Sequence, residues 1–205
     1  ASKQMSESIE TLFGELRSLL NRAPRDYAWA RELEDIVARA DERGDASYKG
    51  RWGPYLDGFA SHWPAPFCRL SSIENLARFG EMMPSATFDL FLRASTSKLG
   101  LEHLAVLPAL ERVRSLDLKR CGATPEELWT LAGSPHVEQI EELDLSSCHL
   151  ENETLEGFVS ASRFTNVKRL VLDGNELEQP DIDALDDFGK KNPLEELSLA
   201  RCHTG

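Results

Sequence analysis

Basic residues are scarce in this chain of 205 residues, which has 23 lysines and arginines against 35 aspartates and glutamates. The formal net charge of -12 disfavours nonspecific contact with a phosphate backbone, so nucleic acid is not an expected partner. No stretch approaches the roughly 18 to 20 consecutive apolar residues that cross a bilayer. Glu7, Glu10 and Glu15 interrupt the N-terminal leucines, unlike a signal peptide. We therefore expect a soluble, cytoplasmic protein with no membrane insertion.

Common catalytic and metal-binding motifs are also missing from the sequence. It has no G-x-x-x-x-G-K phosphate loop, no G-x-S-x-G nucleophile motif and no H-E-x-x-H zinc motif. The four cysteines include no closely spaced C-x2-C pair of the kind that binds zinc. We expect no catalytic residues, no cofactor and no metal.

The C-terminal half instead contains a repeat with a period of 27 residues. Four segments with alternating apolar positions, typical of strands with one buried face, begin at Val113, Ile140, Val167 and Leu194. A segment with helical spacing follows each of the first three, with apolar pairs Leu128 and Leu131, Leu155 and Phe158, and Ile182 and Leu185. Thr124-Pro125 and Gln179-Pro180 mark helix starts in the same phase. One strand and one helix therefore repeat together.

These segments resemble leucine-rich repeats. The motifs Leu116-x-Leu118-x-x-Cys121, Leu143-x-Leu145-x-x-Cys148, Leu170-x-Leu172-x-x-Asn175 and Leu197-x-Leu199-x-x-Cys202 carry the resemblance. The period and the helical second half are similar to the ribonuclease-inhibitor type. The resemblance implies an α/β solenoid, in which a curved parallel sheet is lined by helices.

Two degenerate units extend the repeat towards the N-terminus, which gives about six units in all. The strand of one is predicted at Thr87–Leu92 and that of the first at Ala60–Ala65, where prolines mark the edge of the sheet. All four cysteines then occupy one position of the repeat, which reads Cys68, Ser95, Cys121, Cys148, Asn175 and Cys202. A short hydrogen-bonding side chain suits the tight turn after each strand, so the thiols are predicted to be structural. This column also explains Cys68, for which a reactive thiolate beside Arg69 and His62 is the alternative.

The N-terminal third is predicted to cap the repeats. Apolar residues at helical intervals indicate one helix within residues 6–22 and a second from Trp29 to Ala40. Residues 48–67 are rich in aromatics, glycine and proline, and form either buried packing or an exposed pocket. Ser71-x-x-Glu74 resembles a capping box that opens the next helix. We assign residues 1–59 to the helical and aromatic cap and residues 60–205 to the solenoid, with its first unit degenerate and its last incomplete.

The C-terminal end of the predicted stack is open. The last repeat lacks its helix, so Leu194, Leu197 and Leu199 should lack a covering layer on one side. Either the chain is part of a longer array, or this edge pairs with another copy in a homodimer. Residues 137–205 also carry 16 acidic and 6 basic side chains, which either attract a basic partner or keep the surface solvated.

The predicted function is non-enzymatic binding of a partner protein on the concave strand face. Varied residues on a rigid frame suit recognition, because the frame loses little entropy when a partner binds. Asp117 and Asp144, one repeat apart, mimic a catalytic carboxylate pair but should remain solvated. Regulation of a small GTPase, implied by the family resemblance alone, and self-association through the C-terminal edge are the alternatives. The predicted partner-binding residues are Asp89, Phe91, Arg93, Asp117, Lys119, Glu142, Asp144 and Arg169.

Overall fold

The computed structural model describes residues 8–22, 27–44, 46–60, 69–93, 99–150 and 154–204. Its helices are α1 (Ile9–Leu20), α2 (Tyr27–Asp41), α3 (Ser47–Ala60), α4 (Ile73–Met82), α5 (Leu101–Ala105), α6 (Pro125–Ala132), α7 (Thr154–Ala161), α8 (Gln179–Lys191) and the 3-10 helix η1 (Pro108–Arg112). Its strands are β1 (Arg69–Leu70), β2 (Phe88–Phe91), β3 (Val113–Asp117), β4 (Glu142–Asp144), β5 (Arg169–Val171), β6 (Glu176–Leu177), β7 (Glu196–Ser198) and β8 (His203–Thr204). None of the helices in these ranges is long and apolar enough to cross a membrane.

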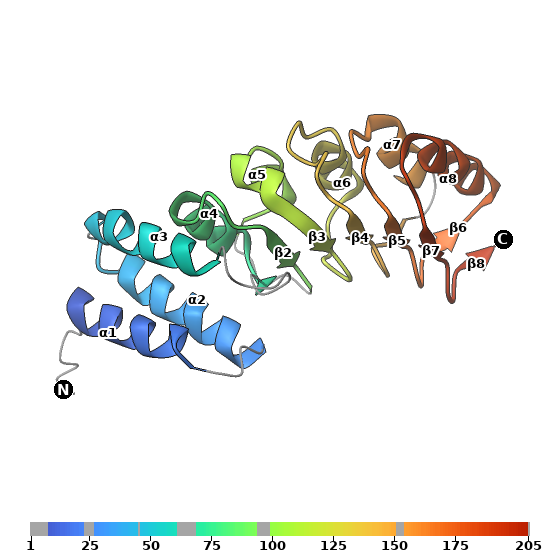
Figure 1. The fold of residues 1–205 in the computed structure, drawn as a ribbon. Coiled ribbons are helices and arrows are strands. Elements are labelled where there is room, and N and C mark those ends of the chain that lie inside the picture. The colour runs from blue at the N-terminus through green and yellow to red at the C-terminus, as the bar shows by residue number, and fades with distance from the viewer. Residues whose placement is uncertain are drawn as a thin grey trace.

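Six strands form a parallel sheet whose order, β1-β2-β3-β4-β5-β7, follows the chain. The helices that follow the strands lie on one side of this sheet, and α1 to α3 precede it (Figure 1). Leu116, Leu143, Leu170 and Leu197 are neighbours in register, so the predicted L-x-L segments do lie side by side. The sheet is not curled, in contrast to the curved sheet that the repeat predicts. Curvature in stacked repeats builds up from a small rotation at each step, and only a few steps are present.

The first strand that the structure describes is β1, at Arg69–Leu70. It pairs Arg69 with Asp89 and Leu70 with Leu90, whereas the strand predicted at Ala60–Ala65 falls, after Ala60 at the end of α3, outside the described residues. Glu34 of α2 explains the position, because its carboxylate accepts hydrogen bonds from the backbone N–H and the hydroxyl of Ser71, at 2.9 and 2.7 Å. These bonds fix the end of β1 against the N-terminal helices. Residues 61–68, with His62 and Cys68, lie outside the described residues.

The helix after β1 is predicted correctly, but its cap is displaced by one residue. Ser72, not Ser71, caps α4 by accepting a hydrogen bond from the backbone N–H of Asn75 at 3.2 Å. Ser71 is unavailable because its hydroxyl donates to Glu34. α6 begins where Thr124-Pro125 predicted a helix start, and Thr124 and Glu127 form a capping box that the sequence analysis did not predict.

The turn column behaves as predicted at Cys148, Asn175 and Cys202. Asn175 accepts hydrogen bonds from the backbone N–H groups of Cys148 and Leu150 and donates to two carbonyl oxygens. The thiols of Cys148 and Cys202 donate to the carbonyl oxygens of Leu118 and Leu172, at 3.1 and 3.2 Å. Cys121, Cys148 and Cys202 are free thiols. The side chains of Cys148, Asn175 and Cys202 therefore satisfy backbone groups inside the stack. Cys68 and Ser95 lie outside the described residues.

The N-terminal helices α1 and α2 match the two predicted amphipathic segments, with Leu12, Leu16, Trp29 and Ile36 buried. A third helix, α3, was not predicted because glycines and Pro54 interrupt its sequence. Its Tyr48 and Trp52 are buried, and their rings pack edge to face at 4.9 Å. For these two aromatics, buried packing is therefore the correct interpretation. Trp63 and Phe67 lie outside the described residues.

The C-terminal edge exposes apolar side chains. Leu197 of β7 is 41% exposed and Ile182 of α8 is 36% exposed, whereas the equivalent leucines of inner repeats are buried. Leu194 and Leu199 are half-buried. This pattern agrees with the expected lack of a covering layer, and self-association through the edge remains a prediction. A two-stranded pairing of β6 with β8, which was not predicted, lies at the same end.

Candidate functional site

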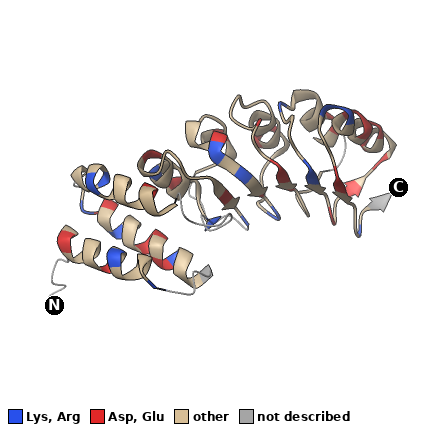
Figure 2. Ribbon diagram, in the orientation of Figure 1, with Lys and Arg blue, Asp and Glu red and all other residues tan. Residues whose placement is uncertain are grey.

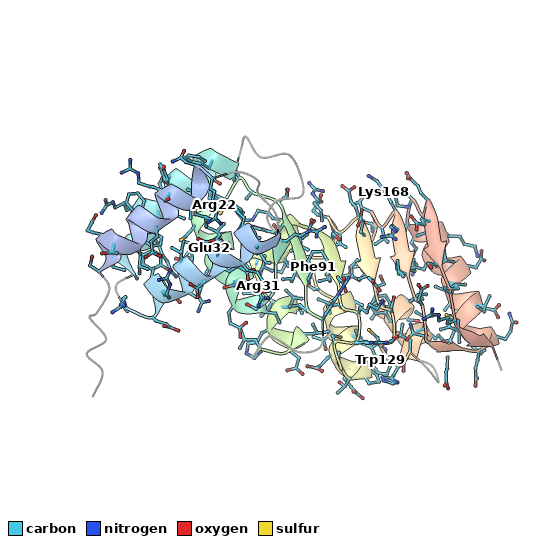
Figure 3. The ribbon with its side chains drawn as sticks, turned by 90° about the horizontal axis from the view of Figure 1, so that it is seen from below. Arg22, Arg31, Glu32, Phe91, Trp129 and Lys168 are labelled. Carbon is cyan, nitrogen blue, oxygen red and sulfur yellow. The ribbon has the colours of Figure 1, made fainter. Side chains whose placement is uncertain are left out.

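Outward-facing residues of the sheet form two in-register rows. The first row contains Asp89, Ser115, Glu142 and Arg169, from β2, β3, β4 and β5. The second contains Phe91, Asp117, Asp144 and Val171 from the same strands. The leucines between these rows point into the core, since successive side chains of a strand alternate between its faces. Figure 3 shows the molecule from below relative to Figure 1, with Phe91 labelled beside the strands.

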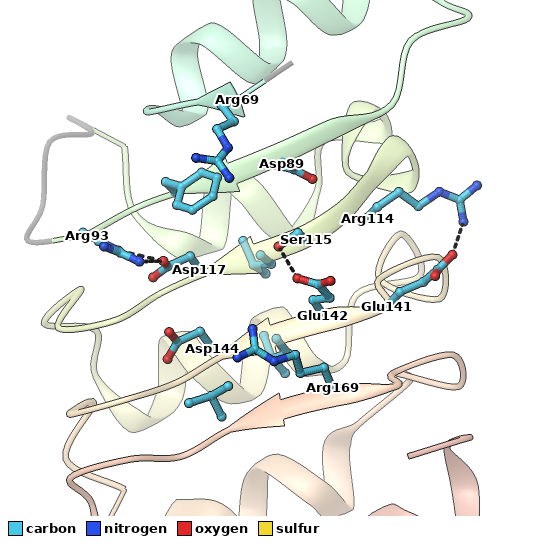
Figure 4. A pocket seen from close by; sticks show the side chains of 14 residues that line it. Arg69, Asp89, Arg93, Arg114, Ser115, Asp117, Glu141, Glu142, Asp144 and Arg169 are labelled. Carbon is cyan, nitrogen blue, oxygen red and sulfur yellow. Dashed lines mark hydrogen bonds and ion pairs between the residues drawn. The ribbon is translucent and has the colours of Figure 1, made fainter. Parts of the chain in front are cut away.

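These rows line a groove of about 490 Å³ on the strand face (Figure 4). Seven of the eight predicted site residues lie in it, and Lys119 does not. Lys119 follows the end of β3, where the chain has entered the turn. The groove is lined by Arg69, Asp89, Phe91, Arg93, Arg114, Ser115, Leu116, Asp117, Glu141, Glu142, Leu143, Asp144, Arg169 and Val171.

Asp117 is part of the framework of the groove. Its carboxylate accepts a hydrogen bond from Arg93 Nε at 2.7 Å and another from the backbone N–H of Lys119 at 3.0 Å. Only 5% of the residue is exposed, so the expectation of a solvated carboxylate is wrong. The guanidinium of Arg93 reaches from beyond the end of β2 and shields Asp117 from water.

Asp144 has a similar structural contact, one repeat further along. Its Oδ1 accepts hydrogen bonds from the backbone N–H of Ser146, at 2.8 Å, and from the Ser146 hydroxyl. Asp173 makes a different contact, between repeats, because it accepts from the backbone N–H of Ala200, 27 residues later, at 2.9 Å. A carboxylate that bonds the backbone two residues later stabilises a turn. Asp117 and Asp144 therefore hold the turns that leave their strands.

Phe91 lies between two arginines at the N-terminal end of the groove. The guanidinium carbons of Arg69 and Arg93 are 5.1 and 5.8 Å from the centre of its ring. Both distances fall in the range of cation–π contacts, which hold the guanidinium groups over the ring. This end of the groove therefore combines an apolar face with positive charge.

The middle of the groove contains carboxylates without an opposite charge in contact. Among the described residues, no side chain or backbone group forms a hydrogen bond or ion pair with the carboxylate of Asp89. Burial raises the pKa of Asp89 to about 6, the nearby Arg69 opposes the shift, and the negative charge of Glu142 adds to it. Glu142 accepts a hydrogen bond from the hydroxyl of Ser115 at 3.3 Å, and no ion pair to it is present in the described part of the chain.

The arginines at the borders of the groove interact with other carboxylates. Arg169 Nε lies 3.0 Å from Glu196, and Arg114 lies 3.4 Å from Glu141. Glu141 also pairs with Lys168 at 2.7 Å. These contacts lower the pKa of Glu141, with the hydrogen bond from Lys168 as the main cause. The border cations therefore contact other carboxylates, and Arg69 and Arg169 act on Asp89 and Glu142 only at longer range, without an ion pair in the described part of the chain.

The geometry of the described residues gives little support to a metal site or to a reactive thiol in the groove. Within the described residues, no cluster of three or more histidine, cysteine or acidic side chains is arranged to hold a metal ion. His149 follows the buried Cys148 but is itself exposed. Interaction with the Cys148 thiol lowers the pKa of the Cys121 thiol to about 7. Cys121 lies in the turn column and outside the groove.

The strand-helix stacking agrees with one comparison with known proteins. The sequence model of the Leucine Rich Repeat family matches residues 139–161. These residues include β4 and α7, one strand and the helix that follows it. The match supports a leucine-rich repeat in this chain, and such motifs suggest a protein-interaction module. The ribonuclease-inhibitor type remains a prediction. No curated protein matches the sequence.

Sequence reasoning missed three charged residues of the groove. Arg69 was missed because it lies beyond the strand predicted at Ala60–Ala65, and the structure places it in β1 beside the groove. Arg114 and Glu141 occupy the second position of their repeats, which also faces outward. A signal was present, because this position reads Arg114, Glu141, Lys168 and Glu195, with alternating charge every 27 residues.

Proposed function

We propose that this chain is a non-enzymatic protein-interaction module that binds a partner protein on the strand face of a leucine-rich-repeat solenoid. The observation that carries the proposal is the groove along β2 to β5, whose lining residues differ at each repeat while the backbone beneath them stays regular. A regular backbone presents such residues at little entropic cost on binding. The ribonuclease-inhibitor type is supported by the 27-residue period and by a helix after each inner strand.

Affinity capture with a charge-reversed groove tests this function. Glu142→Lys with Arg169→Glu changes two exposed groove residues and leaves the net charge unchanged. The matched control, Glu156→Lys with Arg163→Glu, makes the same change at exposed residues of α7 and the loop after it, outside the groove. Proteins captured by the wild-type chain from a cell extract and quantified by mass spectrometry should be lost with the groove variant only. A set of captured proteins that is the same for all three chains would reject the strand face as the binding surface.

A further inference from the structure

The central groove has unpaired negative charge above a small residue. Ser115 lies between Asp89 and Glu142 in the first row, on the strand between theirs. Its short side chain leaves space between two longer carboxylates, and Figure 4 shows Asp89 and Glu142 on either side of it. Neighbouring strands lie about 4.8 Å apart, so the strands of Asp89 and Glu142 are separated by about 10 Å. A single side chain from a bound partner fits that width.

Each of the four arginines that line the groove already contacts another side chain of this protein. Arg93 contacts Asp117, Arg114 contacts Glu141, Arg169 contacts Glu196, and Arg69 lies over the ring of Phe91. No described cation contacts Asp89 or Glu142 within ion-pair distance, and the two carboxylates repel each other. Burial and this repulsion disfavour the ionised form of Asp89 in the free protein. A positive charge between them would relieve both effects.

The charge of the surrounding chain favours the same kind of partner. Residues 137–205 have a formal charge of -10, from 16 acidic and 6 basic side chains. Aspartates and glutamates occur on strands of the sheet and on α8 (Figure 2). Such a surface increases the association rate of a positively charged partner and repels a negatively charged one.

From these observations we infer that the groove binds an extended basic segment of the partner protein, with one lysine or arginine side chain over Ser115 between Asp89 and Glu142. The inference rests on the proposed function and specifies the chemistry of its ligand. Phe91 lies beside this position in the second row and provides an apolar contact for a residue next to the basic one.

Selection from a library of random dodecapeptides displayed on phage tests this inference with the full chain as bait. We expect the recovered peptides to be enriched in lysine or arginine at one position. A synthetic copy of the best peptide, measured by fluorescence anisotropy, should bind about tenfold more weakly to the Asp89→Asn, Glu142→Gln double variant. Replacing its basic residue with norleucine should weaken binding to the wild-type chain to a similar extent.

The matched control is the Glu102→Gln, Glu156→Gln double variant. It removes the same two negative charges from exposed positions on α5 and α7, outside the groove, and should change affinity by less than about twofold. Recovery of no peptide, recovery of peptides without basic enrichment, or equal weakening in both variants would overturn the inference. The proposed function would survive those results if capture still depended on the strand face, and it would fail separately if capture did not.

Discussion

Asn175 Oδ1 accepts the backbone N–H of Cys148 at 3.0 Å and so joins two neighbouring turns of the stack. The same side chain bonds Leu150 N–H and the carbonyl oxygens of Leu145 and Leu172. All these groups are buried and have no water to replace the amide. The turn column therefore depends on the Asn175 side chain in this repeat, whereas the cysteine thiols in other repeats make fewer hydrogen bonds.

Asn175→Ala should lower the free energy of unfolding by about 3 kcal/mol, because it leaves several buried backbone groups without a partner. Urea unfolding followed by circular dichroism measures the change. Cys202→Ala is the control at the same repeat position, where a half-buried thiol bonds one carbonyl oxygen. It should lower the free energy of unfolding by less than about 1 kcal/mol. Equal losses in the two variants would contradict the assignment of this function to Asn175.

Periodicity made this column and the buried leucines predictable from the sequence. A stack of identical modules must bury the same positions at each step, so Leu116, Leu143 and Leu170 repeat with the backbone geometry. The regular 27-residue spacing is lost near the N-terminus, where the paired residues Leu70 of β1 and Leu90 of β2 are only 20 residues apart. There the bonds from Ser71 to Glu34 on α2 determine the strand, and no local pattern encodes such a long-range contact.

Helix α3 shows a second limit of pattern reading. Its glycines and Pro54 argue against a helix by intrinsic propensity. Gly53 has a packing reason, since a Cβ at this residue would lie 2.9 Å from the carbonyl oxygen of Met82 on α4. Close approach of the two helices requires glycine there. Tertiary packing therefore overrides local propensity in this segment.

The groove was predictable as a set of positions but not as a set of interactions. Alternation along each strand determines that Asp89, Asp117 and Glu142 face outward. Whether each carboxylate is paired depends on side chains from other strands, such as Arg93 for Asp117. The sequence therefore did not distinguish the buried Asp117 from the exposed Glu142.

The tight turns after β3, β4 and β5 predict a stabilising substitution. Arg120, Ser147 and Gly174 occupy equivalent positions and all have positive φ, of 55, 53 and 70°. A residue with a side chain is strained in this left-handed region, and glycine is not. Ser147→Gly should therefore raise the free energy of unfolding by about 0.5 to 1 kcal/mol, measured by urea unfolding. Ser160→Gly, on the exposed face of α7, is the control and should destabilise the protein by about 1 kcal/mol.

The thiols of Cys121 and Cys148 should differ in reactivity. Interaction with the Cys148 thiol lowers the pKa of Cys121 to about 7, and the same interaction together with burial raises the pKa of Cys148. Because the thiolate is the reactive form, iodoacetamide at pH 7 should alkylate Cys121 at least about tenfold faster in the folded protein. Peptide mass spectrometry over time measures both rates. Cys148→Ala should slow the reaction of Cys121, and an unchanged rate would show that the interaction does not activate it.

Asp89 should make the protein more stable as the pH falls from 7 to 4. Its pKa is raised to about 6 from an ordinary value of 3.8, so the native state takes up a proton before the unfolded state does. The stabilising contribution is complete below the unfolded pKa and is lost as the pH rises through about 6. Since water screens the partly exposed carboxylate, we expect the effect to be about 1 kcal/mol.

Asp89→Asn isolates this effect because it removes the charge and preserves the shape of the side chain. The variant should unfold with a free energy about 1 kcal/mol higher than the wild type at pH 7.5, and the difference should vanish near pH 4. Urea unfolding at both pH values measures it. A difference in the free energy of unfolding that is the same at both pH values would mean that the charge of Asp89 does not destabilise the folded protein. If the difference follows pH as expected, the free protein tolerates a destabilising carboxylate at the centre of the groove, and a bound cation would recover that energy.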